Sequence, residues 1–175
     1  LNKIYNLRKF DEMFLNNELL NETGLTSFWP IVDGSSYDFI EGNDFQSRLP
    51  MFSTNRLNEA QSSVYIRNEA NIFQAPSGIY FYESLSITAW VKVHSLRNWS
   101  RVIDFGFNRD PRNNVLLSIN SLNNLIPAYG NFNGTNNYDN LYMNRIITLN
   151  TWIHLAATHS ENTVKIYLNG ELTNT

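Results

Sequence analysis

Two segments rich in asparagine and aspartate contain the side chains best suited to metal chemistry. They span residues 108–114 and 131–140. Oxygen-rich loops at the rim of a β-sandwich can hold calcium, which takes about six to eight oxygen ligands. Each segment has one carboxylate, which limits its affinity for a cation, so we expect simple turn formation by asparagine, and a calcium site is the alternative. The candidate ligands for calcium are Asn108, Asp110, Asn113 and Asp139.

Five aromatic side chains flank the same two segments. Exposed aromatic faces beside amide groups suit the apolar face and the hydroxyls of a sugar ring. The alternative is that these rings pack beneath long loops. The residues expected to contact a ligand are Trp99, Tyr129, Phe132, Tyr138 and Tyr142.

The groups that an enzyme needs do not converge in this sequence. Glycoside hydrolysis requires two carboxylates that project from one face, and no such pair alternates along a strand. The chain has no Gly-x-Ser-x-Gly motif, no phosphate-binding glycine loop and no cysteine. His154 and His159 are separated by an odd number of positions on a predicted strand, so they point to opposite faces and cannot chelate one metal. We expect no catalytic residue and no required cofactor.

Asp104-Phe105-Gly106 matches the magnesium-binding triplet of protein kinases. The glycine-rich loop and the catalytic loop that accompany this triplet in kinases do not occur. We therefore expect a strand end, where Asp104 accepts hydrogen bonds and Gly106 relieves crowding.

The composition excludes several classes of protein. The chain has 175 residues, of which 42% are hydrophobic, 14% aromatic and 17% charged, as in a folded domain rather than a disordered segment. The net charge of −3 provides no basic field for nucleic acid or anionic lipid. No run of about 18 apolar residues occurs, so we expect no membrane insertion by this segment.

Hydrophobic residues at helical spacing occupy the start of the chain. Ile4, Leu7, Phe10 and Phe14 recur at steps of three and four, which predicts an amphipathic helix over residues 4–20. We interpret residues 1–24 as a lead-in helix and linker, and a stalk or short coiled coil is the alternative.

After Gly24 the hydrophobic period changes to two. In residues 86–94 the small and aliphatic residues alternate with Thr88, Trp90 and Lys92, which predicts a strand. Many short strands and no second helix favour an all-β sandwich. Further strands are predicted at 101–107, 115–119, 143–149, 152–159 and 163–168, with shorter ones at 28–32, 63–67 and 79–82, and loops at 108–114 and 131–140.

The pair Asn169-Gly170 predicts a tight hairpin after the last of these strands. The returning strand would begin at Glu171, close to Thr175. We therefore expect a domain that is incomplete at its C-terminal end, and the initial Leu1 suggests a fragment at both ends.

The order of the strand motifs resembles a laminin G-like domain of the concanavalin A-like lectin/glucanase superfamily, over about residues 25–170. The resemblance implies a two-sheet antiparallel jelly-roll sandwich over residues 25–175. The motifs are Phe28-Trp29-Pro30-Ile31-Val32, Ser86-Ile87-Thr88-Ala89-Trp90-Val91, Arg101-Val102-Ile103-Asp104-Phe105-Gly106, Thr151-Trp152-Ile153-His154-Leu155-Ala156 and Val164-Lys165-Ile166-Tyr167-Leu168-Asn169-Gly170.

The same resemblance implies a function. Members are non-catalytic recognition or adhesion modules that bind glycans or proteins, with calcium at some loop rims, in extracellular or cell-surface proteins. A fragment of a carbohydrate-active enzyme and a ligand-free spacer are the alternatives. Glycosylation sequons begin at Asn21, Asn98 and Asn133 and are compatible with secretion.

Overall fold

The structure, a computed structural model, describes residues 24–78, 80, 83–95, 100–106, 113–120, 126–133 and 137–175. At residues 113, 120, 126, 131–133 and 137–139 it describes the backbone alone. The predicted helix at 4–20 lies outside the described residues.

The chain divides into two compact units, Leu1–Tyr80 and Phe81–Thr175. The sequence analysis placed one β domain after residue 24, whereas the contacts divide that region at Tyr80 and Phe81.

The first unit contains little regular structure in its described part. Strands β1 (Phe52–Ser53) and β2 (Ser63–Val64) pair antiparallel, and a 3-10 helix, η2, spans Glu69–Asn71. The strand predicted at 28–32 is wrong: Pro30 lacks an N–H donor, and Ile31 has a φ of +49°. The strand predicted at 63–67 is reduced to β2.

A buried carboxylate organises the start of this unit. Asp38 accepts hydrogen bonds from the backbone N–H groups of Phe28 at 2.8 Å, Ile40 at 3.1 Å and Asn43 at 3.1 Å. Burial of Asp38 opposes its ionisation, but these backbone donors outweigh that effect and lower the pKa of the carboxyl. Asp38 is thus a structural anchor for an irregular segment.

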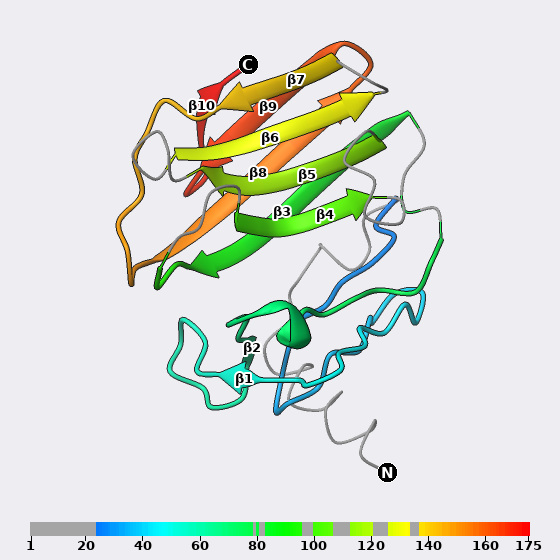
Figure 1. Ribbon diagram of the computed structural model, residues 1–175, viewed down its shortest axis with the longest axis vertical. Coiled ribbons are helices and arrows are strands. Elements are labelled where there is room, and N and C mark those ends of the chain that lie inside the picture. Colours follow the sequence, from blue (N-terminus) through cyan, green and yellow to red (C-terminus); the bar gives the residue numbers. More distant parts are fainter. Residues whose placement is uncertain are drawn as a thin grey trace. The chain divides into compact units, whose positions relative to one another are not determined.

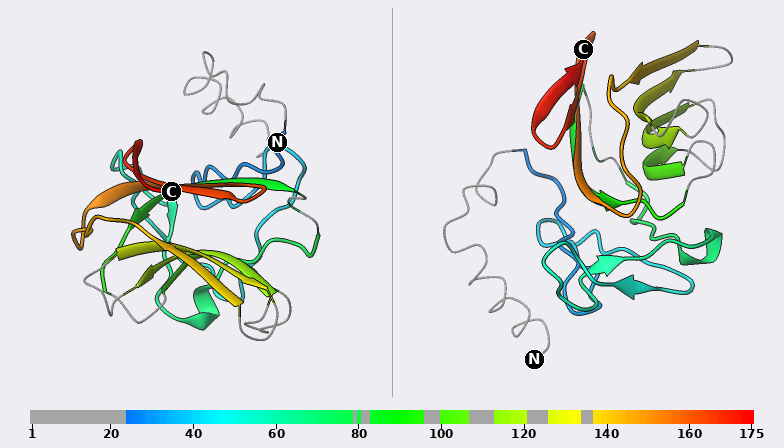
Figure 2. Two further views of the ribbon diagram at one scale, coloured as in Figure 1. Left: turned by 90° about the horizontal axis from the view of Figure 1, so that it is seen from above. Right: turned by 90° about the vertical axis from the view of Figure 1, so that its left-hand side faces the viewer.

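The second unit is a sandwich of two antiparallel four-stranded sheets (Figure 1). One sheet has the order β10-β9-β8-β3 and the other the order β4-β5-β6-β7. Figure 2 shows them as two layers. The strands are β3 (Ser84–Lys92), β4 (Ser100–Gly106), β5 (Asn113–Asn120), β6 (Ile126–Asn133), β7 (Asn137–Tyr142), β8 (Trp152–Ser160), β9 (Thr163–Leu168) and β10 (Glu171–Asn174).

The core lies between these two sheets. Leu155 and Ile166 from one sheet, and Leu117 and Tyr129 from the other, belong to a single cluster of buried side chains. Each is no more than 1% exposed. The all-β sandwich predicted from the sequence is therefore confirmed, because alternating apolar residues of both sheets fill one interior.

The predicted hairpin is also confirmed. Asn169 and Gly170 both have positive φ values, of 52° and 85°, as a two-residue type I′ turn requires. The turn joins β9 to β10, and Leu172 pairs with Tyr167.

Two predictions for the second sheet are wrong. Residues 131–140 were predicted to be a loop, but residues 131–133 belong to β6 and residues 137–140 to β7, because the ladder between these strands outweighs the turn propensity of their asparagines. Residues 143–149 were predicted to be a strand but are irregular after β7. Met143 and Ile147 are buried there while Ile146 is 61% exposed, so the alternation is broken.

Candidate functional site

The outer face of the sheet β4-β5-β6-β7 gathers polar side chains from three strands. Asp104 stands opposite Leu116 on β5, and Leu116 stands opposite Gly130 on β6. Gly130 in turn stands opposite Asn140 on β7, so these four residues form one row across the sheet. The outward positions of the neighbouring rows include Arg101, Asn114, Ser118, Ala128 and Tyr142. We call this surface the polar face.

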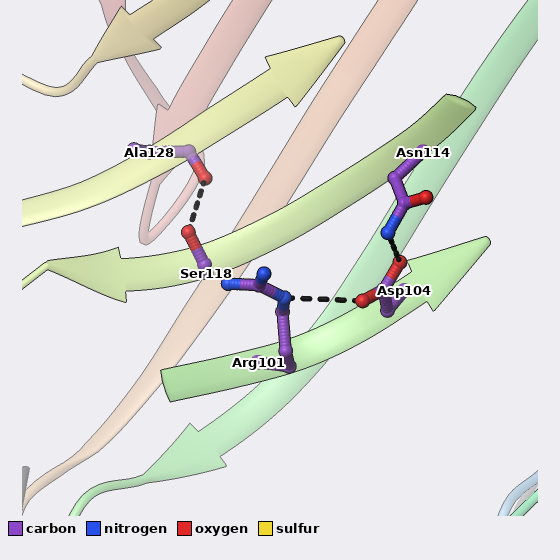
Figure 3. A network of polar contacts seen from close by, with 5 residues as sticks. All are labelled: Arg101, Asp104, Asn114, Ser118 and Ala128. Atoms are coloured by element: carbon purple, nitrogen blue, oxygen red, sulfur yellow. Dashed lines mark hydrogen bonds and ion pairs between the residues drawn. The ribbon is translucent and has the colours of Figure 1, made fainter. Parts of the chain in front are cut away.

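Three of its side chains form a connected group (Figure 3). Nε of Arg101 lies 3.1 Å from Oδ2 of Asp104, and Nδ2 of Asn114 donates to Oδ1 of Asp104 at 3.0 Å. The carboxylate therefore receives a charged donor on one oxygen and an amide donor on the other. The side chains of Arg101 and Asp104 are 39% and 32% exposed, so solvent screens their ion pair and its contribution to stability is small.

The amide oxygen of Asn114 is the least satisfied atom of this group. Asn114 is 8% exposed, and its Oδ1 atom is buried without a hydrogen-bond partner. Asn140 also has a buried, unpaired Oδ1. A buried acceptor without a donor costs about 1–3 kcal/mol, which a hydroxyl, amide or water donor would recover.

Gly106 makes room for this amide. A Cβ atom at position 106 would lie 2.8 Å from Nδ2 and 2.9 Å from Oδ1 of Asn114. The expectations that Gly106 relieves crowding and that Asp104 accepts hydrogen bonds are both confirmed.

The polar face is closed at its centre and open toward β4. Leu116, Ser118 and Ala128 are 1% exposed or less. The hydroxyl of Ser118 is satisfied only weakly, by the carbonyl of Ala128 at 3.5 Å. Since Arg101 and Asp104 are partly exposed on the edge strand β4, a ligand would approach from that side.

Four of the five aromatic residues predicted to contact a ligand stand on the neighbouring strands β6 and β7. Trp99 lies outside the described residues. Phe132 and Tyr138 pair with each other across β6 and β7, in the register row of Asn114, and the structure describes their backbone alone. Tyr142 stands opposite Ala128 on the polar face and is partly buried.

The expectation that Tyr129 presents an exposed ring is wrong. Its side chain is 1% exposed and belongs to the core between the sheets. Its hydroxyl lies 2.9 Å from Nδ1 of His159, which bridges β6 and β8. Burial raises the pKa of Tyr129 to about 12. The outward positions 128 and 130 of β6 are instead taken by alanine and glycine.

The side chains of the predicted calcium ligands lie outside the described part of the structure. Asn108 and Asp110 lie outside the described residues, and Asn113 and Asp139 stand in β5 and β7, with only their backbone described. No group of three His, Asp or Glu side chains within the described ranges could hold a metal ion. On the polar face, a cation at Asp104 would meet the guanidinium of Arg101, so the described residues there fit calcium poorly. The sequons at Asn21 and Asn98 also lie outside the described part, and Asn133 is the last residue of β6.

The two histidines of β8 point to opposite faces, as predicted. His159 contacts the buried Tyr129, whereas the ring of His154 lies 5.2 Å from that of Trp90 on the outer face. They cannot ligate one metal from this strand.

The polar group itself was missed as a site by the sequence analysis. Asp104, Gly106 and the asparagine-rich segment 108–114, which ends at Asn114, were singled out separately, but Arg101 was not. The signal available in the sequence was the charged side chain of Arg101 at an outward position of β4. The residue that faces it on the neighbouring strand is known only from the register of the sheet.

Comparison with known proteins identifies the family. Residues 60–175, more than half of the chain, match the model of a laminin G family. This family belongs to the concanavalin A-like lectin/glucanase superfamily. No helix in the described part of the chain is long and apolar enough to cross a membrane.

A search of curated proteins finds no match. Because the matched residues include both sheets of the sandwich, the chain belongs to the laminin G-like group of the concanavalin A-like lectin/glucanase superfamily.

Proposed function

We propose that this protein is a non-catalytic recognition module that binds a glycan on the polar face. The observation that carries the proposal is the unpaired Oδ1 of Asn114, buried beside the Arg101–Asp104 pair. Asp104 and Asn114 offer acceptors to sugar hydroxyls, and Arg101 offers donors. Neighbouring hydroxyls of one ring present both kinds of group at short spacing, which matches this arrangement.

Binding would use the exposed β4 edge first. Oδ1 of Asn114 is buried and has no partner, so a sugar hydroxyl gains a hydrogen bond with it once the surrounding side chains move aside. Tyr142 lies on β7, three strands or about 14 Å from β4, so a single sugar ring bound at Arg101 and Asp104 does not reach it.

A carbohydrate-active enzyme is the main alternative. Glycosidases of the usual kind use two carboxyl groups about 5–10 Å apart. Among the side chains described on the polar face, Asp104 is the one carboxylate, and Arg101 and Asn114 occupy both of its oxygens. This arrangement favours binding over hydrolysis.

We further propose that the module works outside the cell, where glycans of other cells and of the matrix are accessible. The family and the sequons support this location. Expression through a secretory pathway should add glycans at Asn21, Asn98 or Asn133, which a mass shift on enzymatic deglycosylation would reveal.

The test is a glycan array probed with the 175-residue chain, with calcium and with a chelator. We expect binding of neutral glycans that persists in the chelator. Asp104→Ala should weaken the affinity for the best glycan at least about tenfold, equivalent to about 1.4 kcal/mol. Glu83→Ala, which removes an exposed carboxylate just before β3, should leave that affinity unchanged.

Three outcomes contradict the proposal. An empty array from a correctly folded chain would favour a structural spacer or a protein partner. Binding that Asp104→Ala leaves intact would move the site elsewhere. Cleavage of an array glycan would make the protein an enzyme.

A further inference from the structure

The outer face of the other sheet, β10-β9-β8-β3, carries a different set of side chains. Trp90 on β3 stands opposite His154 on β8, and Lys92 stands opposite Trp152. These four side chains form two neighbouring cross-strand pairs. Together with Lys165 and Tyr167 on β9, they make what we call the aromatic face.

Among the rings of this face, that of Trp90 is exposed, and those of Trp152, His154 and Tyr167 are partly buried. Trp90 is 50% exposed, and its ring centre lies 5.2 Å from that of His154. Nζ of Lys92 lies 5.1 Å from the ring centre of Trp152, a cation–π contact. Leu172, which pairs with Tyr167, is 52% exposed and extends the apolar surface onto β10. Large exposed apolar side chains that gather on one sheet face mark an interaction surface.

The charge of this face is opposite in sign to that of the chain. The chain has a net charge of −3. The outward positions of β3, β8 and β9 nevertheless hold two lysines and one histidine, and none of these described positions holds a carboxylate. Glu171, at the start of β10, is engaged by Arg145, with Nη1 and Oε2 2.7 Å apart. The aromatic face therefore attracts an anionic partner.

Its chemistry favours a protein over a sugar. Sugar hydroxyls need carboxylate or amide acceptors, and the outward positions of β3, β8 and β9 offer only serine and threonine hydroxyls besides the rings and the cations. Exposed tryptophan and tyrosine are typical of the energetically dominant positions in protein–protein interfaces. Leu172 provides a contact for aliphatic side chains, which a sugar lacks.

We propose that the aromatic face docks an acidic protein segment whose apolar side chains cover Trp90 and Tyr167. The carboxylates of the segment would lie against Lys92 and Lys165. Lys92 stands opposite Trp152 and Lys165 opposite Thr158, so the two lysines are about 20 Å apart along the strand direction at 3.4 Å per residue. An extended segment of about six residues spans that length.

This inference does not rest on the polar face, because it uses the other sheet and a different ligand. Failure of one proposal leaves the other standing.

The test measures binding of the 175-residue chain to defined polymers by fluorescence anisotropy. The probe is a random copolymer of glutamate and tyrosine. The comparison polymers are a lysine–tyrosine copolymer and dextran sulfate, which represents a polyanionic glycan. We expect the glutamate–tyrosine copolymer to bind best, with an affinity that falls as salt rises.

Substitutions on the aromatic face test whether the glutamate–tyrosine copolymer binds there. The double substitution Lys92→Glu and Lys165→Glu should weaken binding at least about tenfold, because two attractions become repulsions. Trp90→Ser should weaken it about threefold to tenfold through lost apolar contact. The double substitution Arg48→Glu and Arg67→Glu, an equal charge change at exposed positions of the first unit, should leave the affinity within about twofold.

Folding is checked by near-ultraviolet circular dichroism. If a substitution at Trp90 unfolds the chain, Thr88→Glu adds a negative charge at an exposed outward position and should weaken binding without removing a ring. The proposal is overturned if the folded chain does not bind the glutamate–tyrosine copolymer or if these variants bind it equally well. It is also overturned if the same face binds dextran sulfate more tightly, because the partner would then be a polyanionic glycan.

Discussion

The side-chain amide of Asn114 occupies the space that any side chain at position 106 would need, since a Cβ atom at Gly106 would lie 2.8 Å from Nδ2 of Asn114. The glycine thus sets the position of the amide, and the amide in turn donates to Asp104. A polar group of the candidate site depends on the absence of a side chain on the neighbouring strand.

Gly106→Ala should displace Asn114 and break its hydrogen bond to Asp104. We expect a loss of stability of about 1–3 kcal/mol and weaker glycan binding, measured by urea unfolding and by titration with the best array glycan. Gly78→Ala is the control, because a Cβ there would meet Tyr80 at an ordinary 3.8 Å. Unchanged stability and unchanged binding in Gly106→Ala would show that Asn114 is not held as described.

Tyr129→Phe should alter stability at high pH. The pKa of Tyr129 is raised to about 12 in the folded chain, against about 10 in the unfolded chain. The folded state therefore favours neutral Tyr129, and this stabilisation is present below pH 10 and is lost as pH rises from 10 to 12. Phenylalanine retains the buried ring and cannot ionise.

We expect Tyr129→Phe to be less stable than the parent near pH 7, by about 1–2 kcal/mol, because the hydroxyl no longer contacts His159. Its stability should decline less than that of the parent above pH 10. Thermal unfolding across this pH range measures both effects, and Tyr167→Phe on the outer face is the control. An equal alkaline decline in parent and Tyr129→Phe would contradict the assignment.

Asp38→Asn should destabilise the first unit. An amide nitrogen cannot accept a hydrogen bond, so the variant loses charge-assisted contacts with the backbone of Phe28, Ile40 and Asn43. We expect a loss of about 2–3 kcal/mol at pH 7, measured by unfolding followed with tryptophan fluorescence, since Trp29 lies in this unit.

The pH dependence of the same variant provides a second readout. The pKa of Asp38 is lowered on folding, so its stabilisation is present above about pH 4 and is lost as pH falls through the folded pKa. The stability of Asp38→Asn should not include this contribution from the ionised carboxylate, whereas Glu69→Gln should lose the same stability in acid as the parent. Identical acid unfolding curves for parent and Asp38→Asn would rule out the carboxylate as the anchor.

Gly170→Ala tests the hairpin between β9 and β10. Gly170 has a φ of +85°, and no atom lies within 4 Å of the position of an added Cβ. The expected loss of about 1 kcal/mol therefore comes from the backbone conformation alone. Gly170→Asn should recover part of that loss, because asparagine tolerates this conformation better than alanine. Chemical denaturation compares the three chains, and equal stability of all three would contradict the turn.

The sequence determined the features that depend on local pattern. Alternation of apolar and polar residues predicted β3, β8 and β9, the opposite orientations of His154 and His159, and the sandwich class. Asn169-Gly170 predicted the turn, because few other pairs adopt two successive positive φ values. The position of Asp104 and Gly106 at a strand end followed from the same local reasoning.

Only the tertiary structure decided what depends on partners distant in the sequence. Residues 131–133 of β6 and 137–140 of β7 are rich in asparagine and were predicted to lie in a loop, but the pairing of β5 with β6 and of β6 with β7 fixes them as strands. Tyr129 was expected to be exposed and is buried, because its side of β6 faces the core. Cross-strand register likewise brought Asn114 to Asp104 and Trp90 to His154, and register is set by pairing between strands rather than by the residues of one strand.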